Sequence, residues 1–377
     1  MSKTKIALGV TVGGSSKLLE GQAKYLKSKN YDVYLISPDH PKEKAFSQKE
    51  ECTHIPIKIN RNISIVEDMI TLFSLTLKLR ELRPDIVNFG TPKMGFLGIM
   101  AAKISGIKNR IYTCRGLRYE TEQGNKRKVL MFIERLSAKY ASKVIYVSHS
   151  LMQKAIEDKV GFEHKSIVLA NGSSNGLNLK VYSRENVDEK ERQNLINKHK
   201  LSDKFIIGFI GRITEDKGIE DLINSFETVK SKHENALLIL VGHFECSESL
   251  KDRIDNNTNI ICFPFTDNVP LFLSIFDIFI LPSYREGFPN VPIQAASMGL
   301  PVITTDATGC IDSVKHGYNG FIYPKKNSEK LTKHILAYYN SNELRENHSV
   351  NSIEWAKNFS NEKIWDEQIN LYKNILK

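Results

Sequence analysis

The feature that most constrains the fold of this chain is a repeated alternation of short apolar runs with longer helical patterns. In residues 1–180, runs rich in β-branched residues are separated by segments whose apolar residues recur every three or four positions. Strands separated by such helices favour right-handed crossovers and a parallel, doubly wound sheet. The expected strands are Lys5–Val10, Asp32–Ile36, Asp85–Phe89, Arg110–Cys114, Lys143–Val147 and Ser166–Leu169, and the expected helices are Lys17–Lys29, Ile65–Leu82, Gly95–Ser105 and Lys126–Tyr140.

The same alternation begins again in the second half of the chain. Between the halves, residues 170–176 are dense in turn-forming residues and residues 183–203 are polar, as at a domain boundary. The sequence therefore predicts two Rossmann-like α/β domains that meet near residue 180. The expected elements of the second half are the strands Phe205–Gly211, Ala236–Val241, Asn259–Phe263, Ile278–Leu281 and Val302–Thr305 and the helix Ile219–Lys230, with a hairpin-like turn at residues 316–320.

Composition excludes several other classes of protein. The chain has 377 residues, of which 41% are hydrophobic and 25% charged, as in globular proteins. No run approaches eighteen apolar residues and the N-terminus has no apolar leader, so neither a spanning helix nor a secretion signal is expected. The five cysteines are scattered without a Cys-x-x-Cys pair, which disfavours a metal site and a disulfide framework and makes the cytoplasm the default location.

The positive charge of the chain lies in its first half. Residues 1–180 carry 30 Lys and Arg against 16 Asp and Glu, whereas residues 181–377 carry 23 against 27. A basic half is compatible with a well-solvated surface, with an anionic lipid surface or with a pyrophosphate-linked substrate. Nucleic acid is not expected, because the first half contains no stacking-aromatic motif or zinc knuckle.

The segment Ser283–Asp312 predicts a ligand site. A carboxylate, Glu286, precedes a Gly-Phe-Pro-Asn turn and a short helix for which Asn290 is the expected N-cap. Gly299 is suited to end this helix in the left-handed conformation, and the following proline prevents its continuation. Unpaired N–H groups at a helix start beside an acid can hold phosphate and bind hydroxyls.

A second segment, Gly211–Gly218, predicts an anion-binding loop. Arg212 and Lys217 follow a buried strand, and a helix begins directly after them. Two cations and a helix start can neutralise a departing diphosphate without a metal ion. The alternative is an ordinary charged turn in which both cations pair with Glu215 and Asp216.

Together these two segments resemble the signature of the family-4 retaining glycosyltransferases. That signature has two glutamates separated by seven residues, with Gly-Phe after the first; here Glu286 takes the first place and Gln294 the second. The resemblance covers essentially the whole chain. It implies the GT-B fold, with domains 1–180 and 181–355 and a last helix, about 356–377, that crosses back to the first domain.

The resemblance also implies a reaction. A sugar, most simply from a UDP-linked donor, would be transferred to a saccharide acceptor with retention at the anomeric carbon and without a metal or other cofactor, in agreement with the absence of an Asp-x-Asp sequence. Arg212 and Lys217 would stabilise the leaving diphosphate, and Glu286 would hold donor hydroxyls or support the positive sugar ring. The other expected donor contacts are Gly211, Gly242, Phe265, Tyr284, Gly287, Phe288, Asn290 and Gln294.

The first half supplies the candidates for acceptor binding. The loop after the first strand lacks the G-x-G-x-x-G fingerprint, so a dinucleotide site is disfavoured and a tight structural turn is an alternative. An arginine after the fourth expected strand can hold an anion or pair with Glu120 or Glu122. The candidates for the acceptor or the cleft are Gly13, Gly14, Arg115, Arg118, Ser148 and Asn171.

The helix 126–140 allows two interpretations. Val129, Phe132, Ile133 and Leu136 share one side, and three basic residues lead the helix. Either the apolar side packs on the core, or the helix contacts an anionic membrane.

The resemblance to bacterial surface-polysaccharide transferases suggests a lipid-linked acceptor, such as a polyprenyl diphosphate, used at the inner face of the membrane in capsule or O-antigen synthesis. The alternatives are a UDP-sugar epimerase of the same architecture and a basic protein that binds nucleic acid or lipid without catalysis.

Overall fold

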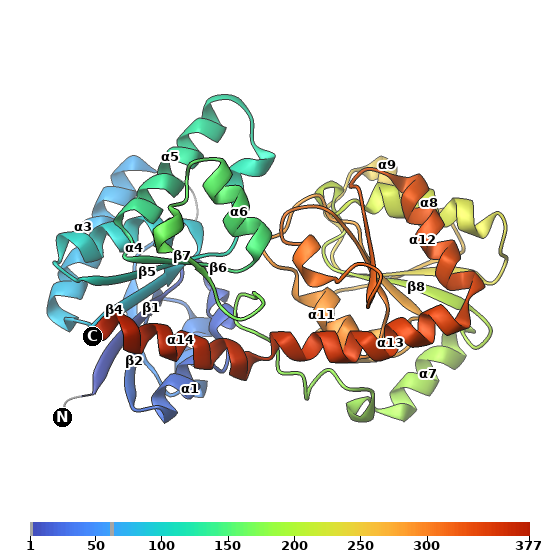
Figure 1. Ribbon diagram of the computed structural model, residues 1–377, viewed down its shortest axis with the longest axis horizontal. Coiled ribbons are helices and arrows are strands. Elements are labelled where there is room, and N and C mark those ends of the chain that lie inside the picture. The colour runs from blue at the N-terminus through green and yellow to red at the C-terminus, as the bar shows by residue number, and fades with distance from the viewer. Residues whose placement is uncertain (1–2, 61–63) are drawn as a thin grey trace. The chain divides into compact units, whose positions relative to one another are not determined.

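The structure, a computed structural model, describes residues 3–60 and 64–377. The chain forms two compact units, the first made of Met1–Gly176 with Asn361–Lys377 and the second of Leu177–Ser360. Each unit is built on one parallel sheet with helices on both faces (Figure 1). The unit boundaries lie within five residues of those expected from the sequence.

The sheet of the first unit has seven parallel strands in the order β3-β2-β1-β4-β5-β6-β7. The order reverses at β1, which pairs with β2 on one side and with β4 on the other. Loops at the carboxyl edge of such a sheet are where ligands bind. The strands are β1 (Thr4–Gly9), β2 (Tyr31–Pro38), β3 (Thr53–Ile57), β4 (Ile86–Gly90), β5 (Asn109–Cys114), β6 (Lys143–Tyr146) and β7 (Ser166–Val168).

The helices of the first unit cover the two faces of this sheet. Figure 1 shows α3, α4 and α5 on one face and α1 with α14 on the other. Trp365 of α14 packs on Tyr25 of α1 with ring centroids 5.1 Å apart, and Asn88 of β4 donates a 2.8 Å hydrogen bond to the Tyr372 hydroxyl. The last helix is therefore part of the first unit's core. The helices are α1 (Gln22–Ser28), α2 (Pro41–Lys49), α3 (Ile65–Leu82), α4 (Pro92–Ile104), α5 (Gly124–Tyr140), α6 (His149–Glu157) and α14 (Asn361–Leu376).

One sequence-based expectation for this unit is wrong. The single helix expected at Lys17–Lys29 is a 3-10 turn, Ser15–Leu19, followed by α1, because Gly21 between them has φ 77° and lies against the Trp365 ring. Of the two interpretations of the helix 126–140, packing of the apolar side on the core holds only in part. Val129 and Phe132 of α5 are exposed and Ile133 is half-buried, whereas Glu134 is buried.

The sheet of the second unit has six parallel strands in the order β10-β9-β8-β11-β12-β13. The hairpin-like turn expected at residues 316–320 is a tight turn at Gly317 that leads into β13, which runs parallel to β12. The strands are β8 (Phe205–Ile210), β9 (Ala236–Val241), β10 (Ile260–Phe263), β11 (Ile278–Leu281), β12 (Val302–Thr305) and β13 (Gly320–Tyr323).

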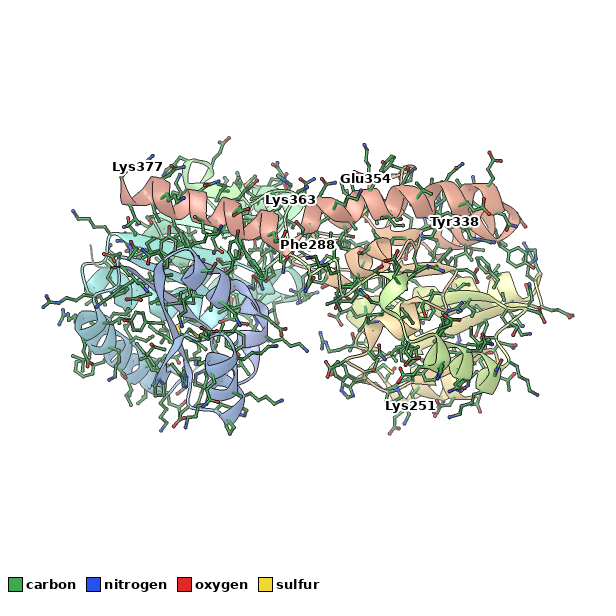
Figure 2. The ribbon with its side chains drawn as sticks, turned by 90° about the horizontal axis from the view of Figure 1, so that it is seen from below. Lys251, Phe288, Tyr338, Glu354, Lys363 and Lys377 are labelled. Carbon is green, nitrogen blue, oxygen red and sulfur yellow. The ribbon has the colours of Figure 1, made fainter. Side chains whose placement is uncertain are left out.

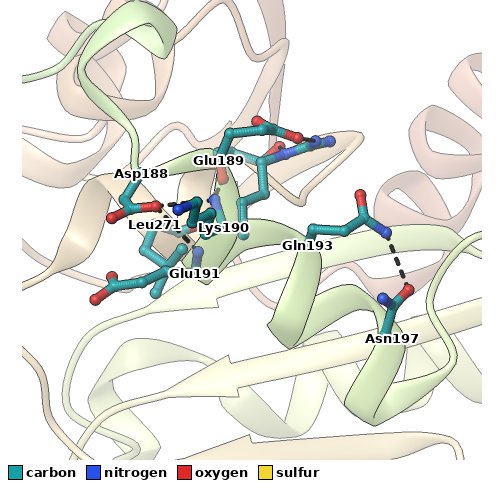
Figure 3. Close-up of polar contacts among 9 residues, drawn as sticks. Asp188, Glu189, Lys190, Glu191, Gln193, Asn197 and Leu271 are labelled. Carbon is teal, nitrogen blue, oxygen red and sulfur yellow. Dashed lines mark hydrogen bonds and ion pairs between the residues drawn. The ribbon is translucent and has the colours of Figure 1, made fainter.

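The helices of the second unit begin with polar, well-capped α7. Asp188 accepts hydrogen bonds from the backbone N–H groups of Lys190 and Glu191, as Figure 3 shows, so the helix starts where an aspartate satisfies its first donors. Tyr338 of α12 is fully buried in this unit (Figure 2). The helices are α7 (Glu189–His199), α8 (Ile219–Lys230), α9 (Glu248–Asp255), α10 (Val269–Leu273), α11 (Asn290–Ser297), α12 (Ser328–Asn340) and α13 (Asn342–Ala356).

Within residues 3–60 and 64–377, no helix combines the length and the apolar character that a membrane span requires.

Candidate active site

The two segments singled out in the sequence meet in an ion pair. Lys217 ends a 3-10 turn that follows β8, and Glu286 lies in the loop after β11; the Lys217 ammonium contacts Oε1 of Glu286. Their side chains are only 15% and 17% exposed. Ser283 Oγ donates a 3.0 Å hydrogen bond to the same carboxylate oxygen. The carboxylate is therefore held by two donors. The alternative of a charged turn, in which Lys217 pairs with Glu215 or Asp216, is not what the structure shows.

The backbone around this pair leaves no space for a side chain at two glycines. Gly218 has φ 67°, and a Cβ there would lie 2.1 Å from the Pro282 carbonyl oxygen. A Cβ at Gly309, which has φ 77°, would lie 2.6 Å from the Glu286 carbonyl oxygen. Both positions need glycine, because the loops carrying Lys217 and Glu286 pass so close to their neighbours.

Tyr284 ties the two loops together. Its backbone N–H donates to the Asp216 carbonyl at 2.9 Å, and its hydroxyl donates to Asp221 Oδ2 of α8 at 2.8 Å. Burial and this carboxylate raise the pKa of Tyr284. Tyr284, expected to contact the donor, therefore has a visible structural role in fixing the Lys217 loop.

Helix α11 begins next to Glu286. Its N-cap is Pro289, and Asn290 is its first residue, so the expected capping by Asn290 is wrong. No side chain caps this end, and the first N–H groups of a helix have no intrahelical acceptor. The positive end of α11 is therefore available to an anion beside the Lys217–Glu286 pair. Gly299 ends this segment with φ 75°, as expected.

Three buried polar atoms without hydrogen-bond partners lie in this same short stretch. They are Arg285 Nε, Asn290 Oδ1 and Gln294 Oε1. Asn290 and Gln294 are four residues apart, so they share one face of α11. Buried donors and acceptors are nearly always paired in proteins, so these three atoms are places where a ligand or a water molecule would complete the hydrogen bonding.

Gln294 is oriented by a residue that the sequence analysis missed. Its Nε2 donates a 2.8 Å hydrogen bond to the Tyr182 hydroxyl, which leaves Oε1 as the acceptor. Tyr182 lies near the start of the second unit, 112 positions from Gln294, so no local spacing pointed to it. Arg285, next to Glu286, was also missed.

The Arg212 side chain does not pair with Glu286 as the Lys217 side chain does. Its guanidinium pairs with Glu245 at 3.0 Å, and both side chains are about half exposed. The loop itself is tightly packed, since a Cβ at Gly242 would lie 1.8 Å from the Gly211 carbonyl oxygen. Arg212 thus lies just after β8, at the carboxyl edge of the sheet, with its side chain about half exposed.

The aromatic candidates divide into one exposed and one buried residue. Phe265 is exposed and stacks on His243, with ring centroids 5.2 Å apart and planes 9° apart, so this pair offers a flat surface. Phe288 (labelled in Figure 2) is instead buried against Phe359 at 5.2 Å. The Phe288 side chain therefore belongs to the core, and the prediction that it contacts the donor is not supported by its position.

In the first unit, Arg115 is the most unusual of the predicted residues. It follows β5, and its Nε donates a 2.7 Å hydrogen bond to Ser174 Oγ, while its buried Nη1 has no partner. Burial lowers the pKa of Arg115 to about 10. A Cβ at Gly90 would lie 1.4 Å from Nη1, so the guanidinium occupies space that only glycine leaves at the end of β4. The alternative, an ion pair of Arg115 with Glu120 or Glu122, is not seen among the residues that the structure describes.

The other predicted residues of this unit lie at the same edge of the sheet but differ in role. The Gly14 N–H donates to Glu43 Oε1 at 2.5 Å, so this glycine loop is held by an internal carboxylate, and Gly13 lies against the His40 ring. Ser148 is the N-cap of α6. Arg118 and Asn171 are exposed. The contacts of Gly13, Gly14 and Ser148 thus show a structural role for each of these three residues.

Nothing in the described parts of the chain resembles a metal site, since no three His, Cys, Asp or Glu side chains gather as ligands would.

Two family models match the chain, one in each unit. Residues 5–149 match the model described as Glycosyl transferase 4-like, and residues 191–355 match Glycosyl transferases group 1. The chain is also 36% identical, over all of its length and 99% of the relative's, to the capsular polysaccharide biosynthesis glycosyltransferase CapM of Staphylococcus aureus. The chain belongs to this glycosyltransferase family. The predicted family and enzyme class are confirmed.

Other relatives of this glycosyltransferase extend the comparison. It is 25% identical, over 94% of both chains, to a Campylobacter jejuni enzyme named N,N'-diacetylbacillosaminyl-diphospho-undecaprenol alpha-1,3-N-acetylgalactosaminyltransferase. Among solved structures, a Rickettsia africae glycosyltransferase matches with a TM-score of 0.82 at 21% identity, covering 100% of both chains. Anabaena HepE in complex with UDP matches with a TM-score of 0.80 at 18% identity, over 98% of this chain and 100% of HepE. These likenesses confirm the predicted GT-B fold.

Proposed function

We propose that this glycosyltransferase moves a sugar from a UDP-sugar to a lipid-linked saccharide acceptor in capsular polysaccharide synthesis, with retention at the anomeric carbon and without a metal ion. The full-length similarity to CapM supports the pathway. The C. jejuni relative is named for a diphospho-undecaprenol acceptor, which supports the acceptor class. HepE, which shares the fold, is solved with UDP and with UDP-glucose, which supports the donor class.

The observation that carries this proposal is the Lys217–Glu286 pair beside the start of α11. An ammonium has three donors, and Glu286 uses one of them, so two remain for phosphate oxygens. The N–H groups at the start of α11 add a second source of positive potential. Together they would stabilise the charge that develops on a departing diphosphate, with Arg212 of the same loop as a further cation.

The unpartnered acceptors on α11 suit the hydroxyls of the donor. Gln294 Oε1, held in place by Tyr182, would accept from a ribose hydroxyl, and Asn290 Oδ1 from a second hydroxyl. The second carboxylate oxygen of Glu286 would accept from the sugar ring's hydroxyls. The exposed His243–Phe265 stack offers a face for a base such as uracil.

Retention follows if the acceptor hydroxyl attacks on the side from which the diphosphate leaves. The bond from the anomeric carbon to the phosphate oxygen breaks, and the bond to the acceptor oxygen forms on the same face. The acceptor's proton passes to the departing phosphate oxygen, so no side-chain base is needed.

The test is a comparison of Lys217→Met with Lys251→Met, a substitution of an exposed lysine on α9 of the same unit (Figure 2). We expect Lys217→Met to lower kcat by about 100- to 1000-fold, the usual effect of removing one preorganised electrostatic contact. Lys251→Met should leave kcat unchanged. Turnover of Lys217→Met within twofold of wild type, in a folded protein, would remove the leaving-group role.

A further inference from the structure

The outer face of α3 is apolar where a surface helix is usually polar. Six large apolar side chains of this helix are between 49% and 81% exposed, while its buried residues include Thr71 and Thr76. At 100° per residue, these six fall within a stripe roughly 140° wide, into which neither Glu67 nor Asp68 falls. The stripe consists of Ile65, Val66, Met69, Ile70, Phe73 and Leu77.

Helix α5 shows the same inversion. Val129 and Phe132 are 52% and 61% exposed, whereas its buried residues are Glu134, Ser137 and Ala138. Helix α4 packs against both α3 and α5, so the three helices form one layer on the sheet (Figure 1). We call the six residues of the α3 stripe, together with Val129 and Phe132, the outer apolar face. Six exposed large apolar side chains on one stripe of α3, with two more on α5 of the same layer, indicate a partner.

The charge of the same layer indicates which partner. Helices α3, α4 and α5 contain nine Lys and Arg against four Asp and Glu. Three of the nine, Lys126, Arg127 and Lys128, lead α5 directly before Val129. A second copy of the chain would bring like net charges together, which disfavours association through this face. An anionic bilayer neutralises the cations and accepts the apolar side chains at the boundary between headgroups and acyl chains.

The outer apolar face begins at the same edge of the sheet as the candidate acceptor residues. Each of the three helices follows a strand of the parallel sheet, so each begins at the carboxyl edge, where Arg115 and the Gly13–Gly14 loop also lie. Ile65, Val66 and the three leading cations of α5 are thus at the ligand-binding edge of the unit.

We propose that the outer apolar face binds this enzyme to an anionic membrane surface, with α3 lying in the interface. The binding itself is argued from exposure and charge alone. Its consequence rests on the proposed function: the bilayer would present the head group of a lipid-linked acceptor at the carboxyl edge of the first sheet.

The experiment measures co-sedimentation of the full chain with vesicles of phosphatidylglycerol and phosphatidylcholine in equal parts, and with vesicles of phosphatidylcholine alone. The test variant is Ile70→Ser/Phe73→Ser. The matched control is Val350→Ser/Ile353→Ser on α13, which removes two side chains that are 69% and 47% exposed in the second unit. We expect wild type and control to bind the anionic vesicles, and the test variant to bind at least tenfold more weakly.

A charge variant separates the two contributions to binding. Lys126→Gln/Lys128→Gln should weaken binding to the anionic vesicles severalfold and leave the small binding to phosphatidylcholine unchanged, because each cation near an anionic surface contributes separately. Added salt should reduce wild-type binding in the same way.

Three results would overturn the proposal. The first is a wild-type protein that stays in the supernatant in the presence of anionic vesicles. The second is equal vesicle binding by wild type and the Ile70→Ser/Phe73→Ser variant. The third concerns self-association. A concentration-dependent dimer in sedimentation velocity that this variant abolishes would assign the face to self-association.

A UDP titration tests the proposed function separately from membrane binding, because the Ile70→Ser/Phe73→Ser variant should bind UDP as wild type does. Vesicle binding without any UDP binding would reject the donor and leave the membrane surface standing.

Discussion

The buried amide of Gln294 shows how a single residue in this site depends on one distant partner. Its Nε2 donates to the Tyr182 hydroxyl, and that bond decides which end of the amide is left as an acceptor. Without it, the amide can rotate and place its NH₂ group where Oε1 now lies. In the proposed function, Tyr182 would thus be a positioning residue that orients Gln294 toward the donor.

This dependence gives a prediction for Tyr182→Phe. The substitution keeps the ring and removes only the hydroxyl, so the fold should be retained. We expect the KM for the donor to rise about threefold to tenfold with kcat little changed, since one neutral hydrogen bond contributes about 0.5–1.5 kcal/mol. Steady-state kinetics at varied UDP-sugar checks this. Tyr318→Phe, on a partly exposed tyrosine of the same unit, is the control. An unchanged donor KM in Tyr182→Phe would contradict the positioning role.

Gly218 and Gly317 differ in the space that surrounds them, so the same substitution should destabilise the protein to different extents. Gly218 and Gly317 both have positive φ, 67° and 72°, but a Cβ at Gly218 would lie 2.1 Å from the Pro282 oxygen, whereas a Cβ at Gly317 would meet nothing within 4 Å. Gly317→Ala should therefore cost only the conformational strain, about 1–2 kcal/mol. Gly218→Ala should cost about 2–4 kcal/mol, because backbone must also shift. Urea unfolding of both variants measures the difference; equal losses would contradict the steric argument.

At the scale of elements, the sequence predicted where helices and strands lie better than which way they face. The bounds of α3 and α8 were expected as observed, since a long period of 3.6 residues marks a helix clearly. The same kind of pattern left open whether the apolar side of the helix 126–140 packs inward, and the structure buries its polar Glu134. Apolar periodicity identifies an apolar side but does not identify what covers it. Strand β3 was missed because it is short, lies at the sheet edge and contains Pro56.

The buried carboxyl of Glu134 on α5 makes the stability of the folded protein depend on pH. Glu134 is buried beside Tyr112 and Cys114, and desolvation, only partly offset by hydrogen bonds from these two residues, raises its pKa from 4.5 to about 7. A carboxyl whose pKa is higher in the folded state makes its greatest contribution to stability below the unfolded pKa. That contribution is lost as the pH rises from about 4.5 through about 7.

We therefore expect Glu134→Gln to stabilise the protein at pH 8 by about 2–3 kcal/mol relative to wild type and to have little effect at pH 4.5. Thermal or urea unfolding of both proteins across this range measures the difference. Glu157→Gln on α6 is the control, because Glu157 is an exposed i,i+4 partner of Gln153. A wild-type minus variant difference that does not change between pH 4.5 and pH 8 would contradict the assignment to Glu134.

At the scale of the whole molecule, the site was predicted in part. Glu286, Lys217 and the start of α11 were found because each lies in a short segment with its own spacing. Their contact joins residues 69 positions apart, and the resemblance to a family supplied what spacing alone did not. Arg285 and Tyr182 were missed because neither a buried unpartnered atom nor a bond across 112 positions leaves a pattern in the sequence.

The division of the chain has an asymmetry that can be tested. The second unit is one continuous segment, Leu177–Ser360, whereas the first needs α14 from the end of the chain. Removal of α14 would uncover a core in which Ile364, Trp365, Ile369 and Tyr372 are buried. We therefore expect residues 177–360 to fold alone with cooperative unfolding, and a fragment ending at Gly176 to lack cooperative unfolding.

UDP should stabilise the isolated second unit, because UDP would bind only to folded protein. The Tm of fragment 177–360 should therefore rise in proportion to the logarithm of the UDP concentration. Cooperative unfolding without any response to UDP would keep the division into units and reject the donor site placed in the second unit. Cooperative unfolding of the fragment ending at Gly176 would show instead that α14 is dispensable for the first unit's core.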